Sequence, residues 1–185
     1  NTSHTLTIKS DKEITISGTT TKDHIVVNGG TKQSPVQLTF NNVVIDTHID
    51  NTPNYSAFTL ENGYAVIELI GENKLGTRWD GIHETNIVVG NNSSLEFTGT
   101  GSLYCNESMG WSKLSIGSGA MVRVTGGMLI LRTSYGQTTV VGSGKFIVDG
   151  GTAKLRSDEG TLFGKDTDVT LKSGNIDIYN EAYSF

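Results

Sequence analysis

The stretch LSIGSGAMVRVTGGMLIL, residues 114–131, contains the unit that decides the fold. It holds three apolar pairs, each interrupted by one residue: Leu114/Ile116, Val122/Val124 and Leu129/Leu131. Gly126 separates the second pair from the third, at a bend where the backbone needs a residue that tolerates a positive φ. Because alternate residues of a strand share one face, the stretch predicts three short strands bent around one apolar interior.

The same unit recurs along the whole chain. The middle pairs are Ile14/Ile16, Leu38/Phe40, Ile67/Leu69, Leu95/Phe97, Val122/Val124, Phe146/Val148 and Val169/Leu171. The pairs before them are Leu6/Ile8, Ile25/Val27, Phe58/Leu60, Ile87/Val89, Leu114/Ile116, Thr139/Val141 and Thr161/Phe163. The corner positions are Gly18, Asn42, Gly71, Gly99, Gly126, Gly150 and Gly174. The middle pairs start 24, 29, 28, 27, 24 and 23 residues apart, a period that is typical of a solenoid.

This repeat predicts an all-β fold, a right-handed parallel β-helix of about seven rungs with three short strands per rung. One rung cannot bury its apolar residues alone, but rungs stacked at about 4.8 Å form a continuous core. We expect residues 1–185 to form a single domain. A β-sandwich is the structural alternative, and it requires hairpin turns, for which Asn62-Gly63 is nearly the only signal. Cys105 is the only cysteine, so an internal disulfide is excluded and an inward position predicts apolar behaviour.

Composition excludes two classes of partner. The net charge is −5 and the basic residues form no cluster, which argues against nucleic acid. The apolar runs are too short to span a membrane as a helix. The chain begins at Asn1 without a signal peptide, so we expect a segment of a larger protein with neighbouring domains, and the missing export signal says nothing about the compartment.

Several stretches resemble β-helical carbohydrate-binding modules of clostridial and other gut-type bacterial surface proteins. They are residues 57–60 (AFTL), 66–75 (VIELIGENKL), 80–82 (DGI) and 117–127 (GSGAMVRVTGG). The resemblance implies a pectate-lyase-like β-helix, an extracellular or cell-surface location, a polysaccharide or host-cell glycan as partner, and calcium as a possible ligand. The chain departs from the family pattern at residues 28–37, where the loop is longer, and no known calcium site matches residue by residue. These motifs build rungs, so they specify the fold better than the ligand.

The connections that lead from one rung to the next are rich in aromatic and charged residues. Equivalent connections of a solenoid stack on one edge, where aromatic rings and flanking polar groups suit the faces and hydroxyls of a sugar. The predicted glycan-binding residues are Tyr55, Arg78, Trp79, Asp80, His83, Glu84, Trp111, Arg132 and Tyr135. Trp111 follows Gly110 as Ile82 follows Gly81, so a position in the core is an open alternative for it.

Two other functions remain as alternatives, and calcium remains a possible ligand. A lyase or glycosidase needs clustered carboxylates, whereas the outward strand positions offer only Glu68 and Glu96, so we expect no enzyme. Asp50, Asp80 and Glu84 are weak candidates for a calcium site, and no other cofactor is expected. A structural stalk, or an adhesin or tail-spike segment that binds a protein or cell-surface partner, is the main rival. Its open ends would need covering, either by neighbouring domains or by Tyr183 and Phe185.

Overall fold

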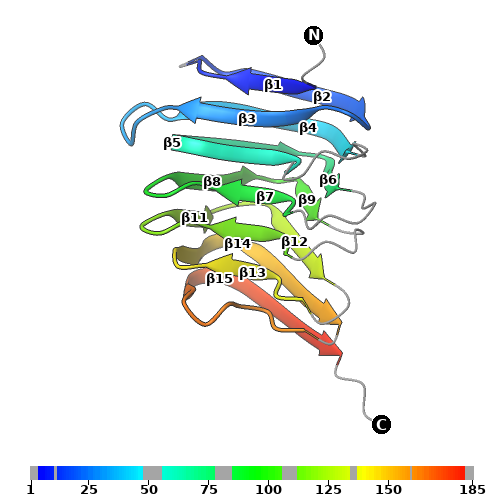
Figure 1. Ribbon diagram of the computed structural model, residues 1–185, viewed down its shortest axis with the longest axis vertical. Coiled ribbons are helices and arrows are strands. Elements are labelled where there is room, and N and C mark those ends of the chain that lie inside the picture. Colours follow the sequence, from blue (N-terminus) through cyan, green and yellow to red (C-terminus); the bar gives the residue numbers. More distant parts are fainter. Residues whose placement is uncertain are drawn as a thin grey trace.

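The structure, a computed structural model, describes residues 4–10, 12–47, 56–77, 85–105, 112–133, 137–158 and 160–181 (Figure 1). Within these ranges the secondary structure consists of strands and turns. The strands are β1 (Thr5–Ile8), β2 (Ile14–Thr20), β3 (His24–Gly29), β4 (Val36–Thr47), β5 (Phe58–Ile70), β6 (Glu72–Thr77), β7 (Ile87–Val89), β8 (Ser94–Gly99), β9 (Ser102–Cys105), β10 (Leu114–Ile116), β11 (Met121–Val124), β12 (Met128–Thr133), β13 (Val140–Gly142), β14 (Lys145–Asp158) and β15 (Asp168–Glu181). None of the described segments is a helix long and apolar enough to cross a membrane.

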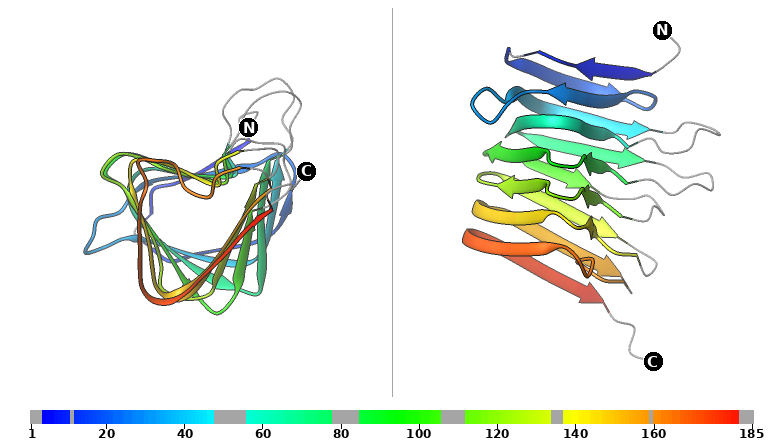
Figure 2. Two further views of the ribbon diagram at one scale, coloured as in Figure 1. Left: turned by 90° about the horizontal axis from the view of Figure 1, so that it is seen from below. Right: turned by 60° about the vertical axis from the view of Figure 1, so that its left-hand side comes forward.

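The strands stack as a parallel β-solenoid, which confirms the predicted fold class. The first column of strands runs β1–β3–β5–β7–β10–β13, and every pairing in it is parallel. The column of the middle pairs runs β2–β4–β5–β8–β11–β14–β15. A third column, after the corner, contains β2, β4, β6, β9, β12, β14 and β15. Figure 2 shows the rungs lying over one another around a common interior.

The core fills the space between the three columns. Phe40, Phe58, Phe97 and Phe146 are fully buried, and the rings of Phe40 and Phe58 meet edge to face at 6.1 Å. Cys105 is also fully buried, and burial raises the pKa of its thiol to about 12. The thiol therefore stays protonated near neutral pH and packs as a small apolar group, as the sequence predicts.

The predicted corners carry the expected backbone at six of the seven positions. Gly18, Gly71, Gly99, Gly150 and Gly174 have positive φ, as does Asn42. In the fifth rung the positive φ belongs to Gly127 in place of the predicted Gly126. Two adjacent glycines offer this bend two positions of equal cost, so the sequence alone does not choose between them.

Asn73 occupies an inward position that apolar residues hold in most other rungs. Its side chain is 2% exposed, and its Oδ1 accepts a hydrogen bond of 2.9 Å from the backbone N–H of Val43. Its Nδ2 donates to the carbonyl oxygens of Ile70 and Ser102, at 3.2 Å each. A buried amide therefore satisfies the backbone groups that the corner leaves unpaired, which keeps its burial from being costly.

Two details of the predicted repeat are wrong. Leu95 and Phe97 pair with Ala65 and Ile67, two residues before the predicted partners Ile67 and Leu69. A shift of two keeps every side chain on its face, so the sequence pattern alone does not detect it. In the sixth rung Val140, fully buried, pairs with Leu114 where the pair Thr139/Val141 was predicted.

Thr139 is nevertheless buried, because it precedes the strand at the turn into the rung. Its hydroxyl lies 2.8 Å from that of Thr133 and donates to the carbonyl oxygen of Arg156 at 3.2 Å. Because these hydrogen bonds satisfy its hydroxyl, the polar side chain of Thr139 can be buried as an apolar side chain would be.

Candidate ligand-binding groove

Most of the predicted glycan contacts lie outside the described residues. They are Tyr55, Arg78, Trp79, Asp80, His83, Glu84, Trp111 and Tyr135, together with Asp50 of the weak calcium candidates. The orientation of Trp111 therefore stays a prediction. The strands that lead into these connections do stack in register: Thr47 lies beside Thr77, and Cys105 lies between Leu75 and Leu131. The strands that precede these connections thus end at one edge of the solenoid, and the stacking of the connections themselves stays a prediction.

Arg132, the one predicted contact that is described, lies next to a groove on the outer face of the third column. The outward side chains of this column follow one another in register from strand to strand: Val44, Lys74, Tyr104, Ile130, Lys154 and Asp177. A second row, two residues closer to the loop edge, contains Arg132, Arg156 and Tyr179. Parallel stacking places these rows along the axis of the solenoid, across the strands (Figure 2).

Two hollows form this groove. One, of about 250 Å³, is lined by Tyr104, Ile130, Arg132, Lys154, Leu155, Arg156, Asp177 and Tyr179. The other, of about 590 Å³, is lined by Val44, Glu72, Asn73, Lys74, Ser102, Tyr104 and Ile130. Tyr104 and Ile130 belong to both walls, so the hollows adjoin. We call their combined extent the outer groove.

A shared carboxylate fixes the two arginines beside the groove. Asp158 accepts from Arg156 Nε at 2.9 Å and from Arg132 Nη2 at 3.2 Å. Burial opposes the ionised form of Asp158, but these hydrogen bonds outweigh it and hold the pKa of the carboxyl below its ordinary value. The guanidinium carbon of Arg156 lies 5.0 Å from the centre of the Tyr179 ring, a cation–π contact. The guanidinium groups of Arg132 and Arg156 are therefore held in place by contacts within the protein.

Tyr104, Tyr179 and Arg156 are not among the contacts that the sequence predicts. Both tryptophans lie in the connections, whereas these three residues lie on strands after the corner, whose pattern indicates only inward apolar pairs. The available signal was the alternation itself: an aromatic residue at an outward strand position, such as Tyr104 between Leu103 and Cys105, needs an explanation other than the core.

The two glutamates of the enzyme alternative are not aligned. Glu68 pairs with Thr98, whereas Glu96 pairs with Val66, so the two are offset along their strands. Glu68 accepts from Thr39 at 3.4 Å, and Glu96 accepts from Thr125 at 2.8 Å.

Arg123 extends this polar ladder toward the next rung. It lies 3.8 Å from Glu96 and also forms an ion pair with Asp149. The hydrogen bond from Arg123 keeps the pKa of Asp149 below its ordinary value. Glu96 and Asp149 thus share one guanidinium group on the sheet face.

Metal-ligating side chains do not cluster in the part of the chain that the structure describes: no group of three or more His, Cys, Asp or Glu residues there could hold an ion. The calcium candidates Asp50, Asp80 and Glu84 all lie in undescribed segments, so calcium binding stays a prediction.

Comparison with protein-family models, with curated proteins and with solved structures found no match to this chain. The parallel solenoid agrees with the fold that the resemblance implies, whereas the family and its carbohydrate binding are not shown by these comparisons.

Proposed function

We propose that the chain is a non-catalytic carbohydrate-binding or adhesion module that holds a polysaccharide or cell-surface glycan in the outer groove. The observation that carries the proposal is the meeting of two tyrosines with two fixed guanidinium groups along one groove. The predicted aromatic residues of the connections, Trp79 above all, would extend the contact from the neighbouring edge.

The chemistry of the groove supports a sugar ligand. Tyr104 and Ile130 offer partly exposed apolar surface for the C–H face of a sugar ring. Arg132, Arg156 and Lys154 supply hydrogen-bond donors around it. Because Asp158 already orients both guanidinium groups, binding costs little side-chain entropy. The groove crosses several rungs, so a linear glycan lying along the solenoid axis fits it better than a single sugar.

The test is retention on a panel of immobilised plant, microbial and host glycans, measured with and without calcium. We expect Tyr104→Ala to weaken binding of the retained glycan by at least about tenfold, since stacking on an aromatic ring is lost. Tyr64→Ala is the matched control, because Tyr64 is also half-buried but lies outside the groove. Both variants should keep the melting temperature within a few degrees of the unmodified chain.

The possible outcomes distinguish whether the chain binds glycan at all from whether it does so in the outer groove. If the unmodified chain retains no glycan under either condition, the proposed function is wrong. If Tyr104→Ala binds as Tyr64→Ala does, the outer groove is wrong, and Trp79→Ala then tests the predicted contact at the loop edge. A loss of retention on removal of calcium would assign a role to the acidic connections.

A further inference from the structure

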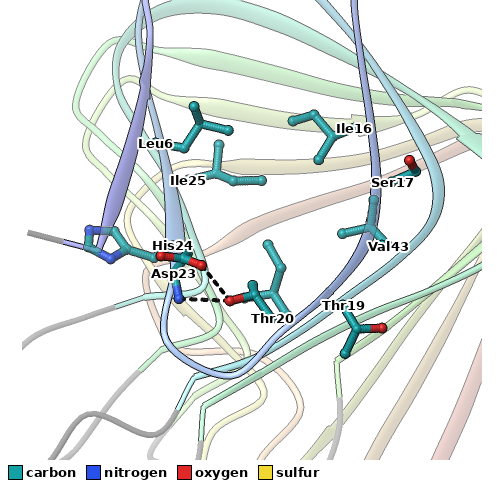
Figure 3. A pocket seen from close by; sticks show the side chains of 11 residues that line it. Leu6, Ile16, Ser17, Thr19, Thr20, Asp23, His24, Ile25 and Val43 are labelled. Atoms are coloured by element: carbon teal, nitrogen blue, oxygen red, sulfur yellow. Dashed lines mark hydrogen bonds between the residues drawn. The ribbon is translucent and has the colours of Figure 1, made fainter. Parts of the chain in front are cut away.

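The first rung leaves an apolar hollow at the N-terminal end of the solenoid. It measures about 240 Å³ and is lined by Leu6, Ile16, Gly18, Thr20, Ile25, Val43 and Ile45 among others. Figure 3 shows Leu6 and Ile25 on one side of it and Ile16 and Val43 on the other. The hollow exists because Gly18 and Thr20 pair with Val43 and Ile45 yet are too small to cover them.

The last rung, at the C-terminal end, has exposed apolar side chains where the first rung has a hollow. Leu171 and Ile178 of β15 are 53% and 58% exposed, although they pair with the buried residues Val148 and Leu155. Pairing in register gives them the same inward direction as those partners. Their side chains therefore stand on the C-terminal end of the core with no further rung over them among the described residues.

The columns of the solenoid place these two ends in register. The column that ends at Leu171 begins at Ile14, and the column that ends at Ile178 begins at Thr20. One more rung in the same register would set Leu171 over Ile14 and Ile178 over Thr20. The exposed side chain of Ile178 would thus enter the hollow on the side lined by Gly18 and Thr20.

We propose that the chain associates head to tail with a second copy, the C-terminal rung of one copy docking on the N-terminal rung of the next. The contact would continue the parallel ladder, because β15 and β2 run in the same direction and each has one edge without a partner among the described strands. Glu13, the residue before β2, and Lys172, which follows Leu171 and also lies 3.8 Å from Asp149, are both exposed, so this register would bring opposite charges near each other at the rim. This proposal does not depend on glycan binding.

The contact is heterologous, since two different surfaces meet. Every docked pair retains one free surface of each kind, so association should continue into linear assemblies. An isologous dimer, in which two identical ends meet, would stop at two copies.

The test is sedimentation velocity over a range of concentrations. The average mass of the unmodified chain should rise steadily with concentration. Leu6→Asp at one end and Ile178→Asp at the other should each weaken association by at least about tenfold, because the contact would bury an unpaired carboxylate. Both positions are about half exposed, so the rung itself should tolerate the change. Ile70→Asp is the matched control: Ile70 is 40% exposed but belongs to neither end, and its variant should assemble normally.

Mixing the two end variants gives the decisive result. Leu6→Asp keeps an intact C-terminal surface and Ile178→Asp keeps an intact N-terminal surface. The equimolar mixture should therefore form a dimer that cannot grow, while each variant alone stays monomeric. A monomeric unmodified chain at all concentrations, a monomeric mixture, or a dimer of either variant alone would overturn the proposal. Circular dichroism confirms in each case that the variant is folded.

Discussion

Lys113 is fully buried at the turn into β10, beside the edge from which the connections leave. Burial lowers the pKa of its ammonium group, and the nearby Cys105 acts weakly in the opposite direction. The unfolded chain therefore binds a proton at a higher pH than the folded chain does. Between the two pKa values the free energy of unfolding rises with pH, and this stability is lost as the pH falls from the ordinary lysine value toward the lowered one.

We expect Lys113→Met to abolish this pH dependence. The free energy of unfolding of the variant, relative to the unmodified chain, should increase as the pH is lowered below the ordinary lysine pKa of 10.5, by up to about 1.4 kcal/mol per unit of pKa difference. Urea unfolding at several pH values measures it. Lys154→Met, on the exposed outer face, controls for the loss of one positive charge. A constant difference across this range would contradict the prediction.

At the scale of the element, the corners determine how closely successive rungs approach. Gly63 in β5 has φ +104°, and a Cβ placed on it would lie 1.9 Å from the carbonyl oxygen of Gly29 in the rung before. Gly18 in β2 has a similar φ of +99°, but a Cβ there would meet nothing within 4 Å. Both glycines therefore require a positive φ, but only Gly63 lies so close to the backbone of the neighbouring rung that a Cβ would clash with it.

This pair predicts different costs for the same substitution. Gly18→Ala should lower the free energy of unfolding by about 1–2 kcal/mol, the cost of placing a Cβ in the left-handed region. Gly63→Ala should cost at least about 1–3 kcal/mol more, because backbone on two rungs must move apart. Urea unfolding of both variants measures the difference. Equal costs would show that the rungs shift without resistance at this corner.

At the scale of the whole molecule, each rung contacts only its neighbours. The fully buried residues concentrate in the central rungs, whereas Leu6, Leu171 and Ile178 are exposed at the ends. Stability in such a stack is the sum of nearest-neighbour contacts, so the terminal rungs have one contact fewer. Head-to-tail association would supply it.

We therefore expect native-state hydrogen exchange to follow rung position. The amides of β7, β8 and β9 should be the most protected, and those of β1, β2 and β15 should exchange through local fraying. Exchange is measured by NMR or mass spectrometry at a concentration where the chain is monomeric. Raising the concentration should then slow exchange in β2 and β15 together, and uniform protection across all rungs would contradict this account.

The sequence anticipated some parts of the molecule better than others. Alternating pairs such as Val122/Val124 identified strands and their inward faces, because period-2 alternation depends only on adjacent residues. The alternation predicted the wrong pairing partners for Ile67, because a shift of two residues leaves the pattern unchanged. It also predicted the wrong inward residues next to Val140, because hydrogen bonds allow Thr139 to be buried. Of the residues that line the outer groove, the predicted contacts include Arg132 but not Tyr104.

The sequence by itself determined that this chain is a parallel β-solenoid, since alternation and corner residues are local properties that each rung repeats. Only the tertiary structure decided which residues of different rungs become neighbours. Tyr104, Arg132 and Tyr179 lie on three strands, and they meet because parallel stacking sets equal positions of distant segments side by side. The register that joins them depends on packing summed over whole rungs, which no single stretch of the chain encodes.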